Sequence, residues 1–226
     1  MTKLGMWIRW QLLLLAVVMA VLLVLFCGGN GAILRVGHDQ TFKTISEAAA
    51  LARSGDTIMV APGVYAEAVI LDAADVSLEP LGKGDVWVDG GCARENGIHI
   101  SASGVSVSQI GVRNTSGAAV LIDNMATNVK VRETAFQDYN CAENPDQSAA
   151  GIAVCYGGSG IRLIDNQITR RVELPGEAHS YGDGIWFKSD SSLPRGGGHY
   201  ISGNVIKGGF DGIGGETERD PPRFLR

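Results

Sequence analysis

A short motif recurs along this chain: a small or polar residue, a glycine and usually an isoleucine stand before a run of alternating apolar residues. The copies lie roughly 20 to 34 residues apart, the interval of repeat architectures. A repeat of this length predicts a solenoid, in which each copy packs against its neighbours. The copies are Asn96-Gly97-Ile98, Ser116-Gly117-Ala118, Ala150-Gly151-Ile152, Asp183-Gly184-Ile185 and Asp211-Gly212-Ile213.

Short apolar segments run in step with this motif, among them Val105-Ser106-Val107 and Ile161-Arg162-Leu163. Their alternation has period two, so one face of each strand is buried and the other faces water. Each repeat therefore holds two or three strands. Asn166 and Asn204 occupy matching places between two strands, and we expect them at corners, because asparagine tolerates the left-handed conformation and its side chain can bond a stacked neighbour.

One helix is predicted, over residues 43–53, with Ile45 and Ala48 on its apolar face. Thr44 or Ser46 lies near its start and Gly55 lies just past its end, as helix caps require. A helix ahead of the first coil would cover the open end of the stack, whose unpaired edge otherwise favours aggregation. We interpret it as an N-terminal cap.

The opening of the repeat region carries a family resemblance. Residues 41–48 (TFKTISEA) and 55–65 (GDTIMVAPGVY) resemble the start of right-handed parallel β-helix proteins, the pectin-lyase-like superfamily. The resemblance covers about residues 36–215 and implies an all-β, right-handed parallel β-helix with three sheets and a short capping helix. It identifies no member family, since the signature segments of pectin methylesterases, polygalacturonases and mannuronan epimerases are absent.

The first 31 residues indicate export. Lys3 and Arg9 precede an uninterrupted apolar run over residues 12–27, which suits either a cleaved signal peptide or an uncleaved membrane anchor. The positive flank places the N-terminus inside, so the solenoid is expected in the periplasm, outside the cell, or anchored on the outer side of a membrane. The β-helix domain is assigned to residues 36–226.

The last residues lack a predicted cap. After Gly215 the chain continues as ETERDPPRFLR, without an amphipathic helix or closing strands. Solenoids normally carry capping repeats at both ends. We therefore expect the β-helix of this sequence to be incomplete, as in a fragment.

Three cysteines lie in the predicted domain: Cys92, Cys141 and Cys155. Export would permit a disulfide, and Cys141 with Cys155 could close the short loop between them. The alternative, which we favour slightly, is three small buried residues in a glycine-rich core. No spacing of cysteine and histidine resembles a zinc site.

Asp183 and Asp211 form the best catalytic hypothesis, because they hold the same place in successive repeats with Lys188 near the strand between them. Stacked carboxylates on neighbouring rungs would lie about 5 Å apart, a separation that raises one pKa and resembles a retaining glycosidase. The same pair with Glu216 could instead bind calcium through oxygen ligands. Aspartate before glycine is also ordinary turn chemistry, and we favour that interpretation.

Candidate substrate-binding residues are Trp186, Tyr200 and Arg162. An outward aromatic ring can stack on a sugar, and cations on strands can bind an acidic glycan, although exposed sheet faces commonly carry such residues. The cations that alternate with apolar residues are Arg113, Lys130, Arg132 and Arg162.

The formal net charge of -5 and the absence of a basic stripe argue against nucleic acid as a partner. Two hypotheses follow, both for a monomer. The first is an exported lyase or glycoside hydrolase acting on polysaccharide. The second is a noncatalytic surface β-helix that binds glycan or has a structural role, and the fold alone cannot choose between them.

Overall fold

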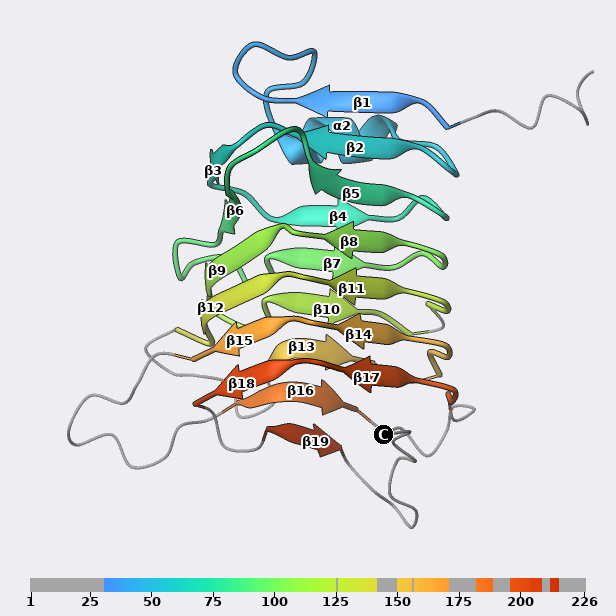
Figure 1. The fold of residues 1–226 in the computed structure, drawn as a ribbon, viewed down its shortest axis with the longest axis vertical. Coiled ribbons are helices and arrows are strands. Elements are labelled where there is room, and N and C mark those ends of the chain that lie inside the picture. The colour runs from blue at the N-terminus through green and yellow to red at the C-terminus, as the bar shows by residue number, and fades with distance from the viewer. Residues whose placement is uncertain are drawn as a thin grey trace, which may run out of the picture. The chain divides into compact units, whose positions relative to one another are not determined.

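The computed structural model describes residues 31–124, 126–141, 150–155, 157–170, 182–188, 196–208 and 212–215. In this part of the chain, parallel strands stack into three sheets, of seven, six and six strands (Figure 1). We call these sheets A, B and C. The chain passes from A to B to C and then returns to A one rung further on, so the right-handed parallel β-helix predicted from the sequence is confirmed.

Sheet A contains β1 (Ile33–Val36), β2 (Thr57–Val60), β5 (Ser77–Pro80), β8 (Ser106–Ser108), β11 (Lys130–Arg132), β14 (Arg162–Ile164) and β17 (Tyr200–Ser202). Sheet B contains β3 (Gly63–Tyr65), β6 (Val86–Asp89), β9 (Gly111–Thr115), β12 (Ala135–Tyr139), β15 (Gln167–Thr169) and β18 (Val205–Lys207). Sheet C contains β4 (Val69–Leu71), β7 (Ile98–Ile100), β10 (Val120–Ile122), β13 (Ala150–Val154), β16 (Asp183–Phe187) and β19 (Ile213–Gly215). Coils 1 to 6 are β2–β4, β5–β7, β8–β10, β11–β13, β14–β16 and β17–β19.

The core is a set of columns in which inward residues of successive coils stack on one another. In coils 2 to 5, every sheet receives at least one buried aliphatic or aromatic side chain, in register with its counterpart on the neighbouring coil. This stacking explains the period-two alternation, because every second residue of a strand fills the core. The inward column of sheet A is Ile58, Leu78, Val107, Val131 and Leu163, all with 0% exposure.

The motif glycine marks a close approach between sheets C and B. A Cβ on Gly184 would lie 2.4 Å from Cγ2 of Ile206 and 2.6 Å from the carbonyl oxygen of Gly212. A Cβ on Gly151 would lie 2.5 Å from Cγ2 of Ile168. Glycine is therefore required by space at the start of the sheet C strand.

One copy of the predicted motif has a different register in the structure. The structure pairs Ile98 with Val120 rather than with Ala118. Val120 is fully buried and fills the core position, so the true counterpart of Asn96-Gly97-Ile98 is Ala118-Ala119-Val120. The remaining copies have the predicted register, with Ile152 paired to Ile185 and Ile185 paired to Ile213.

Asn166 and Asn204 lie at the corner between sheets A and B, as predicted. Asn166 is fully buried; its Nδ2 donates to the carbonyl oxygen of Val131 (3.0 Å) and to Oδ1 of Asn204 (2.9 Å). The left-handed conformation belongs instead to the preceding residues, Asp165 (φ 53°) and Gly203 (φ 67°). The asparagines thus link successive coils through their side chains, while their neighbours make the turn.

The capping helix α2 (Ile45–Leu51) is shorter than the predicted range and packs over the first coil (Figure 1). Thr44 is its N-cap, in a reciprocal capping box with Glu47. The carboxylate of Glu67 accepts further hydrogen bonds from the backbone N–H groups of Ile45 (2.8 Å) and Ser46 (2.8 Å). The start of the helix is thereby fastened to the loop between β3 and β4.

Candidate functional site

The outer face of sheet C carries the largest share of the predicted site residues. An outward column runs along it through Ile70, His99, Leu121, Ala153 and Trp186, each in register with the next. Because the inward neighbours of these residues fill the core, the column is directed to the outside of the solenoid. We treat this face as the candidate site.

Trp186 is half-buried on this face and packs against an alanine cluster formed by Ala118, Ala150 and Ala153. The Nζ of Lys188 lies 5.5 Å from the centre of its indole ring, within the range of a cation–π contact. The small alanines leave room for the large ring. Trp186 and Lys188, which were predicted as substrate-binding and catalytic residues, are therefore neighbours.

Asp183 begins β16 and pairs with Ala150 of the coil above. A Cβ on Gly214 would lie 2.3 Å from its Oδ2, so the carboxylate reaches across the start of β19. The other carboxylates of the hypothesis, Asp211 and Glu216, lie outside the described residues. The catalytic pair and the calcium site consequently remain predictions.

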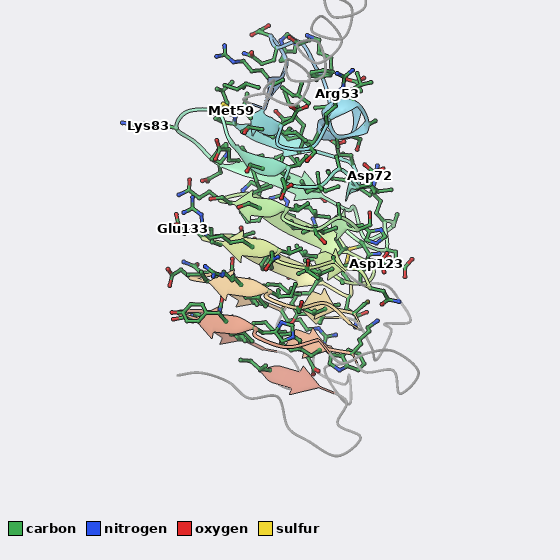
Figure 2. All side chains as sticks on the ribbon, turned by 90° about the vertical axis from the view of Figure 1, so that its right-hand side faces the viewer. Arg53, Met59, Asp72, Lys83, Asp123 and Glu133 are labelled. Carbon is green, nitrogen blue, oxygen red and sulfur yellow. A yellow bond between two sulfur atoms is a disulfide. The ribbon has the colours of Figure 1, made fainter. Side chains whose placement is uncertain are left out.

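Arg162 and Tyr200 lie elsewhere. They are paired neighbours on the outer face of sheet A, beside Lys130. Figure 2 shows the outer faces of sheets A and C on opposite sides of the solenoid, with Glu133 beside the first and Asp123 on the second. The structure therefore does not bring Arg162 and Tyr200 together with Trp186, and the substrate-binding roles of these residues remain predictions.

Sequence reasoning missed a contact between a histidine and an aspartate on sheet C. The alternation of Ile98, His99 and Ile100 predicts that His99 faces solvent. In the structure its Nε2 lies 3.2 Å from Oδ2 of Asp123, and both side chains are half-buried. Asp123 directly follows β10, one coil beyond His99. Only the register of β7 and β10 could have revealed this pair, because the two residues are 24 positions apart.

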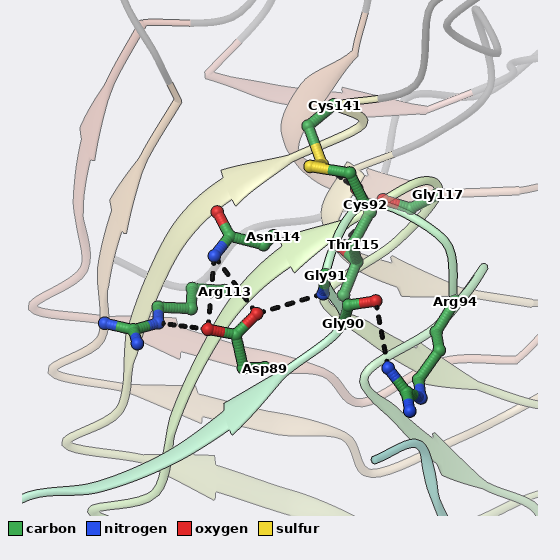
Figure 3. Close-up of a disulfide and its surroundings, with 10 residues drawn as sticks. All are labelled: Asp89, Gly90, Gly91, Cys92, Arg94, Arg113, Asn114, Thr115, Gly117 and Cys141. Atoms are coloured by element: carbon green, nitrogen blue, oxygen red, sulfur yellow. Dashed lines mark hydrogen bonds and ion pairs between the residues drawn. A yellow bond between two sulfur atoms is a disulfide. The ribbon is translucent and has the colours of Figure 1, made fainter. Parts of the chain in front are cut away.

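The cysteines pair differently from the prediction. A disulfide joins Cys92 to Cys141 with a Cα–Cα distance of 5.5 Å, and Cys155 is free. Figure 3 shows the bond above Thr115 of the intervening coil, whose carbonyl oxygen accepts the backbone N–H of Cys141. The loops after β6 and β12 both leave sheet B at the same corner, so residues two coils apart can meet there.

The free thiol does not behave as an activated nucleophile. Cys155 directly follows β13, and burial raises the pKa of its thiol, an effect that nearby Lys188 opposes and Asp123 reinforces. A catalytic cysteine requires the opposite shift, toward the thiolate. Cys155 is therefore a poor candidate for covalent catalysis.

A buried tyrosine lies within electrostatic reach of Asp183. Tyr139 is 1% exposed, and burial raises the pKa of its hydroxyl to about 12; the charge of Arg170 opposes this rise and that of Asp183 adds to it. Tyr139 is thus protonated at neutral pH. Its side chain belongs to the hydrophobic core and not to the outer face of sheet C.

Two absences hold for the residues that the structure describes. Among them, no cluster of three or more histidine, cysteine, aspartate or glutamate side chains is arranged to hold a metal ion. No helix in the described segments has the length and apolar character needed to cross a membrane. The predicted signal or anchor at the N-terminus lies outside those segments.

Comparisons with known proteins give one family match. No curated protein matches the chain. Among solved structures, a pectin methylesterase from Aspergillus niger is 15% identical, with a TM-score of 0.44, over 87% of this chain and 84% of that chain. A pectin methylesterase from carrot is 16% identical, with a TM-score of 0.36, over 84% of this chain and 64% of that chain. A family profile matches residues 28–223, and the chain therefore belongs to the family described as "Protein of unknown function (DUF1565)".

Proposed function

We propose that this protein is an exported β-helix protein that binds polysaccharide on the outer face of sheet C. The observation that carries the proposal is Trp186, an outward indole seated on three alanines with a lysine beside its ring. A ring of this kind offers an apolar face to a sugar, while Lys188 supplies a polar group beside it. The parallel strands extend this face over several rungs, which suits a polymer better than a single sugar.

A catalytic form of the proposal, a lyase or glycoside hydrolase, is favoured by the His99–Asp123 pair. A carboxylate bonded to one imidazole nitrogen fixes the tautomer and leaves the other nitrogen to accept a proton. The pair lies on the same face as Trp186, several rungs away along the column. A noncatalytic glycan-binding protein is the alternative, and there the pair would only support the sheet.

Export is part of the proposal and rests on the apolar segment over residues 12–27. The disulfide supports it, because disulfides persist mainly in oxidising compartments. If the segment is not cleaved, it would anchor the solenoid on the outer side of a membrane.

Electrophoresis through gels that contain polysaccharide tests the binding. We expect the protein to be retarded and Trp186→Ala to migrate as in a blank gel, while Ile33→Ala, an exposed residue of sheet A, behaves as wild type. Loss of retardation in Tyr200→Ala but not in Trp186→Ala would move the site to sheet A. Circular dichroism checks that each variant is folded.

Product analysis decides between the two forms. An enzyme would release unsaturated uronides or new reducing ends, and His99→Gln would lower that rate at least tenfold without changing retardation. Retardation without any product, over a panel of acidic and neutral polysaccharides, would establish the noncatalytic form.

A further inference from the structure

A second aromatic platform lies on the outer face of sheet B, within coils 1 to 3. Val64, Trp87 and Gly111 follow one another in an outward column. A Cβ on Gly111 would lie 2.5 Å from Cε3 of Trp87 and 2.7 Å from its Cζ3, so the indole rests directly on the glycine. Val64, one rung before Trp87, is 58% exposed. The column therefore presents an apolar strip to solvent with the indole at its centre.

An arginine is held in place beside this strip. The Nε of Arg113 donates to Oδ2 of Asp89 (2.7 Å), and its Cζ lies 5.4 Å from the centre of the Trp87 ring. Asp89 also accepts from Nδ2 of Asn114 (3.1 Å) and from the backbone N–H of Gly91 (2.9 Å). The side chain of Asp89 is 17% exposed, so its carboxylate is a fixed anchor for the guanidinium.

The two terminal nitrogens of the Arg113 guanidinium are available for hydrogen bonding within the described chain. Neither terminal nitrogen of Arg113 donates a hydrogen bond to a described residue, and 33% of the side chain is exposed. Figure 3 shows both nitrogens directed away from Asp89. A guanidinium fork with a fixed position and free donors matches the geometry of a carboxylate and loses little side-chain freedom on binding.

From this geometry we infer that Trp87, Arg113 and Val64 form a binding site for an acidic sugar unit. The carboxylate of the sugar accepts hydrogen bonds from the two terminal nitrogens of Arg113, and the C–H face of the ring lies on the strip formed by Val64 and Trp87. An isolated inorganic anion would use the fork but not the strip. The inference rests on the proposed function for carbohydrate as ligand, but it places this contact on a different sheet from Trp186.

The test titrates the full chain with an oligogalacturonate of defined length, and with a neutral oligosaccharide of the same length. Binding is measured by calorimetry. Arg113→Lys keeps the charge but loses the fork, and we expect at least fivefold weaker binding of the acidic probe. Trp87→Ala should weaken it to a similar extent, and the neutral probe should bind more weakly than the acidic one to the wild type.

Charge changes at Val64 keep the test independent of folding, because this side chain is exposed. We expect Val64→Glu to weaken binding of the acidic probe about fivefold and Val64→Lys to strengthen it, by Coulomb interaction at close range in water. Ile33, which is 57% exposed on sheet A, gives the matched controls Ile33→Glu and Ile33→Lys. Their effects should stay within twofold.

The outcomes separate this site from the proposed function. Equal affinity of the wild type, Arg113→Lys and both Val64 variants for the acidic probe overturns the sheet B site. If Trp186-dependent retardation on polysaccharide persists in that case, the proposed function stands without the second site. Absence of both retardation and oligogalacturonate binding overturns both. Tight binding of an acidic peptide in place of the sugar also overturns the assignment of the ligand.

Discussion

The asparagine that links coils 4 and 5 gives the sharpest stability prediction. Asn166 is fully buried; its Nδ2 donates to the carbonyl oxygen of Val131, and its Oδ1 accepts the backbone N–H of Thr134 (3.1 Å). Asn166→Ala leaves both backbone groups buried without these partners. Each unsatisfied group costs about 1–3 kcal/mol, so we expect the free energy of unfolding to fall by about 2–5 kcal/mol.

Urea denaturation followed by circular dichroism measures the change, since the midpoint falls while the slope should stay the same. Gln167→Ala is the matched control; this neighbour is exposed, and its change should stay within about 0.5 kcal/mol. Asn166→Asp should be at least as damaging as Asn166→Ala, because a carboxylate cannot donate to Val131 and is costly to bury. A loss for Asn166→Ala equal to that of Gln167→Ala would refute the reasoning.

Three further changes test other parts of the structure. Gly184→Ala should destabilise the fold by about 1–3 kcal/mol through overpacking, whereas Gly197→Ala, with open space around its Cα, should be nearly neutral; both are read from melting temperatures. Cys92→Ser with Cys141→Ser should cost about 2–4 kcal/mol, and mass spectrometry of the untreated protein should find the Cys92–Cys141 peptide pair and a free Cys155. Burial alone would raise the pKa of Asp89, but hydrogen bonds from Arg113, Asn114 and Gly91 lower it below its ordinary value. Its contribution to stability is therefore present above the unfolded-state pKa and lost as pH falls through the folded-state pKa. Asp89→Asn should make the free energy of unfolding depend less on pH in the acidic range.

The fold could be predicted because the residues that specify it repeat. Inward aliphatic residues recur along the coils, and Gly97, Gly151 and Gly184 recur before the inward residue of a sheet C strand because the space between the sheets is limited there. The alternation of Ile98, His99 and Ile100 already indicates a strand. The start of the helix could also be predicted, because Thr44, one of the two candidate caps, lies directly before the apolar pattern of the helix. Errors arose where the repeat is weakest, as at Ala118, where the true match is two residues further on.

The candidate site could be predicted only in part, because its contacts join residues that are distant in sequence. Trp186 and Lys188 are two positions apart and were found together, whereas His99 and Asp123 meet only through the register of two coils. The coils also differ in length: hydrogen-bonded partners on neighbouring coils lie 24, 32 and 38 residues apart. No fixed period therefore reveals which outward residues are neighbours.

The disulfide also joins residues that are distant in sequence, and it lies beside the proposed sheet B site. Cys92 and Cys141 are 49 residues apart and meet because loops at the corner between sheets B and C can pass over an intervening coil. The loop that carries Cys92 also carries Gly91, whose N–H helps to hold Asp89 and, through it, Arg113. The covalent bond therefore fixes one side of the proposed sheet B site while the core columns fix the other. Because the inward columns carry the stability, outward residues such as Trp87 and Trp186 are free to serve binding, so function in this solenoid must be sought on the outer faces.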